Sequence, residues 1–263
     1  MRSAQRIVLI GYGAVAQAVL RNLAQHKRSV EVLGVLRRQK HPDPALRFFD
    51  SLEELLSLKP DLVVECAGQA AVVQYAERIA AAGVDLMTIS MGAFADTALL
   101  ENTRAAALKT GAQIIIPAGA VGALDVLAAV RHEGIERVTF RSTKLPKAWA
   151  GTAAEKAVDL SKVTVPVVFF TGNAKEAALA YPMNANVAAA VALAGAGFER
   201  TTIELVADPA VAGNLNEVVA EGPFGRFNIS MLGKTRPEAP RTSISAPLSI
   251  VRGVMNRAAG VVV

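Results

Sequence analysis

A glycine-rich turn near the N-terminus constrains the fold of this chain more than any other feature. The apolar run Ile7–Ile10 leads directly into Gly11–Ala16 (GYGAVA), and a helical pattern follows. Gly11 permits a tight turn out of a strand, Gly13 lets the backbone approach a pyrophosphate, and Ala16 allows close helix packing. Unpaired N–H groups at the positive end of the helix dipole would meet the phosphates. The strand, turn and helix indicate a dinucleotide-binding domain rather than a turn that serves packing only, with contacts from Gly11, Gly13, Ala14 and Val15.

The N-terminal part of the chain alternates between short apolar runs and helical patterns. The runs are rich in Val, Ile and Leu without strict alternation, which is typical of parallel strands buried on both faces. We expect strands at Ile7–Ile10, Val30–Leu36, Leu62–Cys66, Leu86–Ser90 and Gln113–Ile116. Helices are expected at Ala14–Gln25, Leu52–Leu58, Ala71–Ala82 and Thr97–Thr110, with start signals at Ser51 and Asp96 and stop signals at Gly83 and Gly111. This order predicts an α/β fold with a doubly wound parallel sheet of Rossmann type.

The pattern changes after Pro117, where several strand-like runs alternate between apolar and polar residues. We expect strands at Val138–Thr143, Val167–Phe170, Thr202–Ala207 and Arg226–Met231, and helices at Ala123–Val130 and Ala185–Ala196. These elements predict a second, mixed α+β domain that holds the substrate. A terminal helix, Leu248–Ala258, is expected to pack back on the first domain. The predicted domains are therefore residues 1–120 with 241–263, and residues 121–240.

Composition narrows the class of protein. Of the 263 residues, 52% are hydrophobic and 19% are charged, which is typical of a globular protein. Cys66 is the single cysteine, so no disulfide forms within the chain, and no apolar run approaches the ~20 residues of a membrane span. We expect a cytoplasmic protein without membrane contact. The net charge of +5 is scattered and only 5% of residues are aromatic, which argues against nucleic-acid binding and suits either anionic ligands or a merely solvated surface. No spacing of His, Cys, Asp or Glu indicates a metal site.

The choice of nucleotide depends on the end of the second expected strand. An acidic side chain there would bind the ribose hydroxyls of NAD. The sequence instead has Arg37 and Arg38 after Leu36, and no acidic residue before Asp43. Because a guanidinium binds phosphate in a bidentate fork, these arginines predict that NADP is accepted as well as or in preference to NAD. The alternative is that both arginines are simply exposed.

Two later turns contain small residues where parallel strands end. Cys66, Ala67 and Gly68 follow one strand, and Ser90 begins the turn after the next. Small residues there let a ribose and a nicotinamide lie against the backbone, so we expect these four residues to bind the cofactor. Cys66 itself is expected to be a small buried residue rather than a nucleophile. We interpret Glu65, at the strand end, as structural.

Several longer blocks resemble the L-aspartate dehydrogenase family, and they cover nearly the whole chain in the same order. They are VECAG at 64–68, SMGA at 90–93, PAGAVGALD at 117–125, YPMNANVAA at 181–189, ADP at 207–209 with Asn214 and Glu217, and GPFG at 222–225. The resemblance implies oxidation of L-aspartate to iminoaspartate, with hydride transfer to NAD or NADP. The imine then hydrolyses to oxaloacetate and ammonia or supplies pyridine nucleotide biosynthesis. The resemblance also implies a homodimer, cofactor contacts from Ala120 and Asn186, and a family lysine at Lys144.

One position departs from the family pattern. The family's proposed catalytic histidine lies two residues after the asparagine matched by Asn214, and here that position is Asn216. An asparagine side chain can hydrogen-bond with a substrate, but it cannot exchange a proton near neutral pH and cannot be a general base. Three explanations remain open: a weakened aspartate dehydrogenase, an enzyme for a different amino or keto acid that uses another base such as Lys144, or an introduced change. The candidate catalytic residues are Asn216 and Lys144.

Other roles stay open for two of these residues. Asn186 could instead cap the alanine-rich helix, and Lys144, with Lys147, could bind substrate carboxylates. The three histidines, at 26, 41 and 132, lie in polar or helix-end contexts and are expected at the surface. The leading hypothesis is an NAD(P)-dependent aspartate dehydrogenase. The alternatives are a dehydrogenase or reductase for a related amino or imino acid, and a catalytically silent dinucleotide-binding regulatory protein.

Overall fold

The computed structural model describes residues 4–37, 44–182, 184–236 and 239–262. The chain divides into two compact units, here called the first unit (Met1–Gly119 with Ala246–Val263) and the second unit (Ala120–Ser245). Arg38 and His41 lie outside the described residues. Within the described part of the chain, every helix is too short or too polar to cross a membrane.

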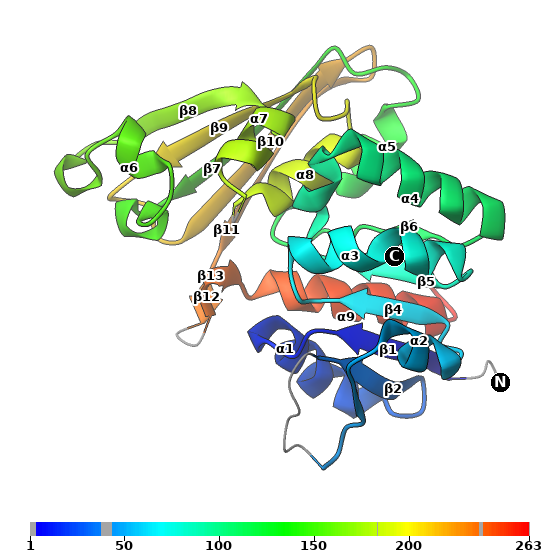
Figure 1. Cartoon of the computed structure of the whole chain (residues 1–263). Helices are drawn as coiled ribbons and strands as arrows, with labels where there is room; N and C mark the ends of the chain where they lie inside the picture. The colour runs from blue at the N-terminus through cyan, green and yellow to red at the C-terminus, as the bar shows by residue number, and fades with distance from the viewer. Residues whose placement is uncertain (1–3, 38–43, 183, 237–238, 263) are drawn as a thin grey trace. The chain divides into compact units, whose positions relative to one another are not determined.

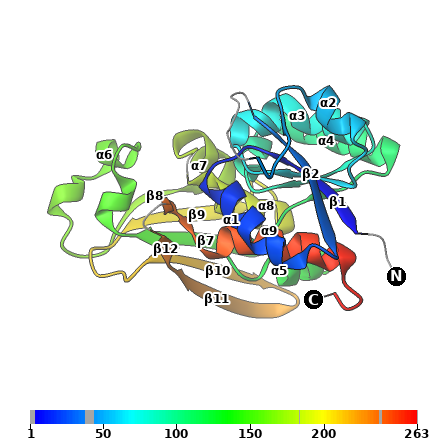
Figure 2. The same ribbon diagram turned by 90° about the horizontal axis from the view of Figure 1, so that it is seen from below.

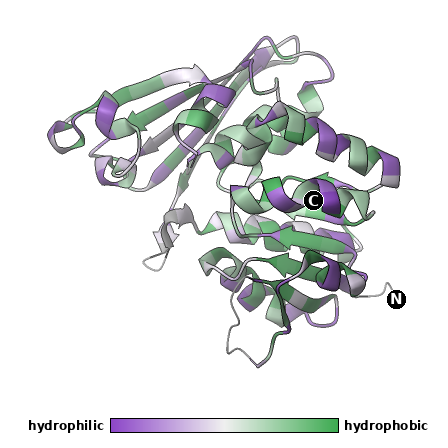
Figure 3. Cartoon of the chain, in the orientation of Figure 1, coloured by the Kyte–Doolittle hydropathy of each residue, from purple (hydrophilic) through white to green (hydrophobic). Residues whose placement is uncertain are grey.

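The first unit contains a six-stranded sheet with the order β3-β2-β1-β4-β5-β6, and every pair of neighbouring strands is parallel (Figure 1). The predicted Rossmann-type sheet is therefore confirmed. The strand bounds are Gln5–Ile10 (β1), Val30–Leu36 (β2), Phe48–Phe49 (β3), Leu62–Glu65 (β4), Asp85–Thr88 (β5) and Ile114–Ile115 (β6). All four residues of β4 are buried, and the strands are coloured mainly as hydrophobic in Figure 3, as expected for a sheet covered on both faces.

The helices of the first unit cover both faces of this sheet. Their bounds are Ala14–Leu23 (α1), Leu52–Ser57 (α2), Gln69–Ala81 (α3), Thr97–Thr110 (α4) and Ser245–Ala258 (α9). Helices α1 and α9 lie side by side on one face, and Ile250 and Val254 of α9 share a buried core with Ile7 of β1 (Figure 2). The prediction that the terminal helix packs on the first domain is thus confirmed. The predicted start and stop signals of α4 are confirmed as well. The Asp96 side chain accepts hydrogen bonds from backbone amides at the start of the helix, and Gly111 ends the helix in the left-handed conformation.

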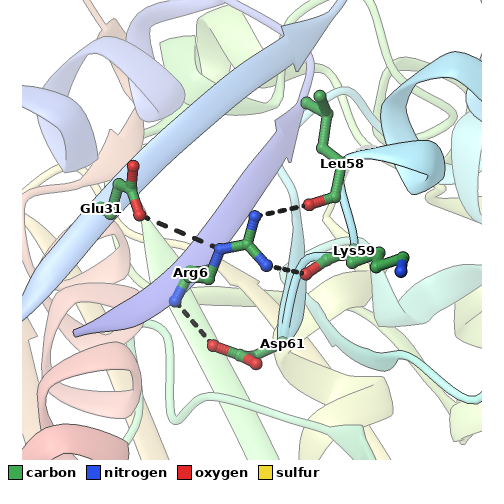
Figure 4. A network of polar contacts seen from close by, with 5 residues as sticks. All are labelled: Arg6, Glu31, Leu58, Lys59 and Asp61. Atoms are coloured by element: carbon green, nitrogen blue, oxygen red, sulfur yellow. Dashed lines mark hydrogen bonds and ion pairs between the residues drawn. The ribbon is translucent and has the colours of Figure 1, made fainter. Parts of the chain in front are cut away.

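A network of polar contacts around Arg6 connects the amino-terminal end of β1 to the segment between α2 and β4 (Figure 4). The guanidinium donates to the carbonyl oxygens of Lys59 at 2.8 Å and Leu58 at 2.7 Å, the unpaired carbonyls that follow α2. The backbone N–H of Arg6 donates to Asp61 Oδ2 at 2.7 Å. Ligands of doubly wound sheets bind at the opposite, carboxyl-terminal end of the strands, so this network serves stability.

The second unit contains a five-stranded sheet with the order β11-β10-β7-β9-β8. Strands β7 and β9 are parallel and the other pairs are antiparallel, which confirms the predicted mixed domain. The bounds are Arg137–Lys144 (β7), Val167–Asn173 (β8), Thr201–Ala207 (β9), Asn214–Gly222 (β10) and Gly225–Gly233 (β11). Helices α5 (Leu124–Val130), α7 (Ala174–Ala180) and α8 (Ala185–Ala194) contribute to its core, which includes Phe140, Trp149 and Leu205.

Several elements of the second unit were not predicted from the sequence. They are strand β10, helices α6 (Ala154–Ala157) and α7, and a short hairpin of β12 (Thr235–Arg236) and β13 (Ala239–Ser243). The residues of β10 that face the core are Asn216, Val218 and Ala220. Because a polar residue occupies the first of these buried positions, the alternation typical of a strand is hidden in the sequence.

Candidate functional site

The glycine turn joins β1 to α1 at the carboxyl-terminal edge of the first unit's sheet. Gly11 has a φ of +94°, and a Cβ atom at this position would lie 2.8 Å from the backbone of Ala67. Both the conformation and the lack of space therefore require glycine. Gly13 is different, because no described atom lies within 4 Å of where its Cβ would be. Its missing side chain leaves open space beside the backbone, as a close ligand approach needs.

Helix α1 begins directly after this turn without a side-chain cap. Its N-cap residue is Gly13, and its first turn contains no acidic residue. By contrast, α4 is capped by Asp96 and α7 by Asn173. The amides at the start of a helix need an acceptor and carry the positive end of the helix dipole. The start of α1, with Ala14 and Val15, is therefore suited to bind an anion.

Arg37 follows β2 and lies close to the same turn. Its guanidinium carbon is 5.9 Å from the centre of the Tyr12 ring, and its backbone N–H donates to Phe49 O at 2.8 Å. The side chain is partly buried rather than fully exposed. The structure thus places one of the two predicted arginines beside the glycine turn.

The turn after β4 contains Cys66, Ala67 and Gly68. Burial, with a smaller effect from the neighbouring Glu65, raises the pKa of the Cys66 thiol well above its usual range. A thiol that stays protonated is a poor nucleophile. Cys66 is partly rather than fully buried, and its protonated thiol is consistent with the expectation that it is not a nucleophile.

Glu65, interpreted from the sequence as structural, forms hydrogen bonds to the two turns that contain the predicted cofactor-binding residues. Its carboxylate is 1% exposed and accepts four hydrogen bonds. The donors are the amides of Ala67 (2.6 Å) and Gly68 (2.7 Å) and the hydroxyls of Thr88 (2.6 Å) and Ser90 (3.1 Å). Three of the four belong to the residues expected to bind the cofactor. The available signal was a single carboxylate that ends an otherwise apolar strand.

In the second unit, Asn216 lies on β10 opposite Ser142 of β7 and is 4% exposed. The Ser142 hydroxyl donates to Asn216 Oδ1 at 2.9 Å. Asn216 Nδ2 donates in turn to the carbonyl oxygen of Ala120, also at 2.9 Å. The structure therefore brings together Asn216 and Ala120, both singled out from the sequence, and both ends of the amide are engaged.

Lys144 ends β7, two residues after Ser142 and on the same face of the sheet. Its Nζ donates to Asn184 Oδ1 at 2.7 Å and lies 4.7 Å from the centre of the Trp149 ring. Among the described residues, no carboxylate forms an ion pair with it. Burial lowers the pKa of Lys144 to about 8, because desolvation penalises the ammonium form. A neutral amine is therefore available near neutral pH.

The remaining candidates lie in simpler surroundings. Helix α8 has Asn184 as its N-cap residue, so Asn186 belongs to the first turn and the alternative that it caps the helix is wrong. His26 and His132 are exposed as expected, and so is Lys147. Lys147 lines an open pocket of about 910 Å³, together with its neighbours Leu145 and Pro146.

Two families match the two parts of the chain. Residues 11–117 match the family described as homoserine dehydrogenase, NAD binding domain, and residues 125–257 match the family described as aspartate dehydrogenase, C-terminal. The L-aspartate dehydrogenase of Ruegeria pomeroyi is 41% identical over 261 residues, which cover 97% of this chain and 94% of the relative. The L-aspartate dehydrogenase of Brucella anthropi is 39% identical over 269 residues, which cover 100% of both chains.

Solved structures show the same fold. The crystal structure of aspartate dehydrogenase from Thermotoga maritima matches with a TM-score of 0.81 at 24% identity, over 100% of both chains. A hyperthermophilic archaeal homoserine dehydrogenase in complex with NADPH matches with a TM-score of 0.63 at 13% identity, over 97% of this chain and 98% of that one. Because the curated relatives are similar over the whole length and the second family covers residues 125–257, the chain belongs to the L-aspartate dehydrogenase family.

Proposed function

We propose that this chain catalyses the NAD(P)-dependent oxidation of L-aspartate to iminoaspartate, which hydrolyses to oxaloacetate and ammonia. The observation that carries the proposal is the uncapped start of α1 behind Gly11, a position that only glycine can occupy. A ready anion site at the carboxyl-terminal edge of a doubly wound sheet suits a dinucleotide pyrophosphate. Curated relatives named L-aspartate dehydrogenase support the choice of substrate.

The residues present fit the nucleotide. Gly11, Gly13, Ala14 and Val15 would hold the pyrophosphate, and Cys66, Ala67, Gly68 and Ser90 would lie against the nicotinamide half. The family resemblance adds Ala120 and Asn186 as cofactor contacts. When bound, the nicotinamide supplies the hydride acceptor for the substrate Cα. We propose NADP as the better nucleotide, because Arg37 lies at the glycine turn and the strand end lacks an acidic residue. Arg38 would add to this contact.

The reaction also needs a group that removes a proton from the substrate ammonium as the imine forms. Asn216 cannot do this, because an amide does not exchange a proton near neutral pH and both ends of this one are engaged. Lys144 meets the requirement better. It is partly buried and has no ion-pair partner among the described residues, and the lowered pKa of its ammonium makes the neutral amine accessible. We therefore propose that Lys144 Nζ accepts the proton and that Asn216 holds Ala120 and Ser142 in place.

Calorimetry and steady-state kinetics test the proposal together. Purified protein is titrated with NADP and NAD in both redox states, and formation of the reduced nicotinamide is followed by absorbance with L-aspartate. We expect nucleotide binding and turnover, and a Lys144→Met variant that binds nucleotide normally but loses a factor of about 10² to 10⁴ in rate. Lys147→Met is the matched control, because that exposed lysine should be dispensable.

The outcomes separate the competing functions. Absence of affinity for any pyridine nucleotide would overturn the proposal. Tight binding without turnover on any amino or keto acid would instead identify a regulatory protein, which is the class favoured by the asparagine at position 216. Turnover confined to a related amino or imino acid would change the substrate and keep the mechanism.

We also propose that the enzyme works as a homodimer, as the family resemblance implies. One face of the second unit's sheet points away from the unit's core and carries the ion pairs Arg137–Glu221 and Arg141–Glu204. If the two subunits met at this face, their interface would be polar. Light scattering of the purified protein at several concentrations tests this. A mass of one chain at every concentration would refute it.

A further inference from the structure

Helices α1 and α3 begin at the same edge of the first unit's sheet. They differ in whether a side chain of the protein accepts hydrogen bonds from the backbone amides near the helix start. The start of α1 has no acceptor from a capping side chain. The turn that leads into α3 is different, because the amides of Ala67 and Gly68 both donate to Glu65 Oε1. A carboxylate of the protein itself therefore occupies the anion-binding position of this second turn.

The same carboxylate also reaches the neighbouring strand. Glu65 and Thr88 are paired in the register of β4 and β5, and the Thr88 hydroxyl donates to Glu65 Oε2 at 2.6 Å. The Ser90 hydroxyl donates to Oε1 at 3.1 Å, while the Ser90 amide donates to Thr88 Oγ1 at 3.0 Å. One buried charge thus joins the turn after β4 to the turn after β5. Hydrogen bonds to an ionised acceptor are stronger than neutral ones, and removing the acceptor leaves buried donors unpaired.

The geometry extends from these turns to the glycine turn. Ala67 is held by Glu65 and packs so closely against Gly11 that a Cβ on the glycine would lie 2.8 Å away. A shift of Ala67 would therefore change the space in which the glycine turn lies. Glu65 acts on three turns of this edge, directly on two and through Ala67 on the third.

We propose that Glu65 is a positioning residue that holds these three turns in the conformation that binds the nucleotide. The inference rests on the proposed function, since it takes the carboxyl-terminal edge as the nucleotide site. Glu65 itself needs no contact with the ligand, because all four of its hydrogen bonds are to the protein.

Two variants of Glu65 test the role, with a matched control at the opposite edge of the sheet. Glu65→Ala removes the acceptor, and Glu65→Gln keeps the shape while removing the charge. Asp85→Asn is the control, because Asp85 also joins neighbouring elements, accepting from the Gln113 amide at 2.7 Å and pairing with Arg257, but at the start of β5.

The first readout needs no nucleotide. In the wild-type protein the Ala67 and Gly68 amides should exchange slowly with deuterium, since both are hydrogen-bonded to a buried acceptor. We expect their protection to fall in Glu65→Ala and to be unchanged in Asp85→Asn. The second readout is the calorimetric Kd for NADP, which should rise about tenfold in Glu65→Ala and less in Glu65→Gln.

The kinetic pattern distinguishes positioning from a general loss of stability. The KM for the nucleotide should rise in both Glu65 variants, while kcat at saturating nucleotide should change less than about threefold. Should Glu65→Ala fail to fold, Glu65→Gln carries the same test. Unchanged exchange and unchanged Kd in a folded Glu65 variant, or an equal rise of Kd in Asp85→Asn, would overturn the inference. If the wild-type protein binds no nucleotide at all, the proposed function fails first, which is a distinct result.

Discussion

The partly buried Lys144 leads to a quantitative prediction of how the stability of the protein depends on pH. Burial lowers the pKa of this group in the folded chain to about 8, from an ordinary value of 10.5. Between these two pH values, the unfolded chain binds more protons than the folded chain. The free energy of unfolding of the wild-type protein must therefore rise with pH through this window, relative to a variant without the lysine.

The structure sets the size of the effect. Each unit of difference in pKa corresponds to about 1.4 kcal/mol. The free energy of unfolding of the wild-type protein, measured relative to that of Lys144→Met, should therefore rise by about 3 kcal/mol between pH 8 and pH 10.5. Below pH 8 the difference should be constant, because both states then hold the proton. Methionine is close in length to the aliphatic part of lysine and can pack against Trp149 without a charge.

The assay uses the chain's single tryptophan. Trp149 is fully buried in the second unit, and the Lys144 ammonium lies 4.7 Å from its ring. Urea unfolding followed by tryptophan fluorescence therefore reports on the part of the chain that contains Lys144. The wild-type protein, Lys144→Met and the exposed-lysine control Lys147→Met are compared from pH 6 to pH 10.5. Titrations shared by all three proteins cancel in the differences.

A difference between wild type and Lys144→Met that stays flat from pH 7 to pH 10 would refute the reasoning. So would a difference that falls with rising pH, because the sign follows from burial alone. A slope of equal size in Lys147→Met would show that the effect is not specific to the buried group.

Four further predictions follow from the same geometry. If neutral Lys144 accepts the proton, kcat/KM for L-aspartate should rise about tenfold between pH 7 and pH 9, whereas a flat profile would exclude this role. Gly11→Ala should abolish nucleotide binding in calorimetry, because its Cβ would lie 2.8 Å from Ala67 and the φ of +94° strains any other residue; normal affinity would contradict the assignment of the turn. Arg37→Ala should weaken NADP binding about tenfold while sparing NAD, and an equal loss for both would remove the 2′-phosphate role. Asn216→His should raise the rate of aspartate oxidation by about 10² if the family's histidine acts as a base at that position; no rise would show that the carried-over role is wrong.

Local signals in the sequence were sufficient for much of the first unit. The bounds of α4, Thr97–Thr110, were predicted without error, because Asp96 and Gly111 act on the amides and carbonyls next to them. The parallel sheet followed from apolar runs of suitable length, and the glycine turn followed from its position between a strand and a helix. Each of these signals operates within a few residues, so no knowledge of distant contacts is required.

Strand β10 shows where such signals end. Its buried position 216 holds a polar residue, which is stable only because Ser142 and the Ala120 carbonyl, far away in the sequence, supply hydrogen bonds. The sequence alone identified Asn216 as a departure from the family pattern. Only the tertiary structure revealed that its amide bridges two segments.

The sequence by itself therefore determined the class of fold, the glycine-rich turn between the first strand and helix, and the family, because these depend on local periodicity, caps and short motifs. Tertiary structure decided what the buried polar groups do. In the sequence, Glu65 is a carboxylate at a strand end, and only the fold brings the hydroxyls of Thr88 and Ser90 within hydrogen-bond distance. In the same way, only packing desolvates Lys144 and lowers its pKa. Desolvation and hydrogen bonding between distant residues exist only in the folded chain, and the chemistry of this site depends on both.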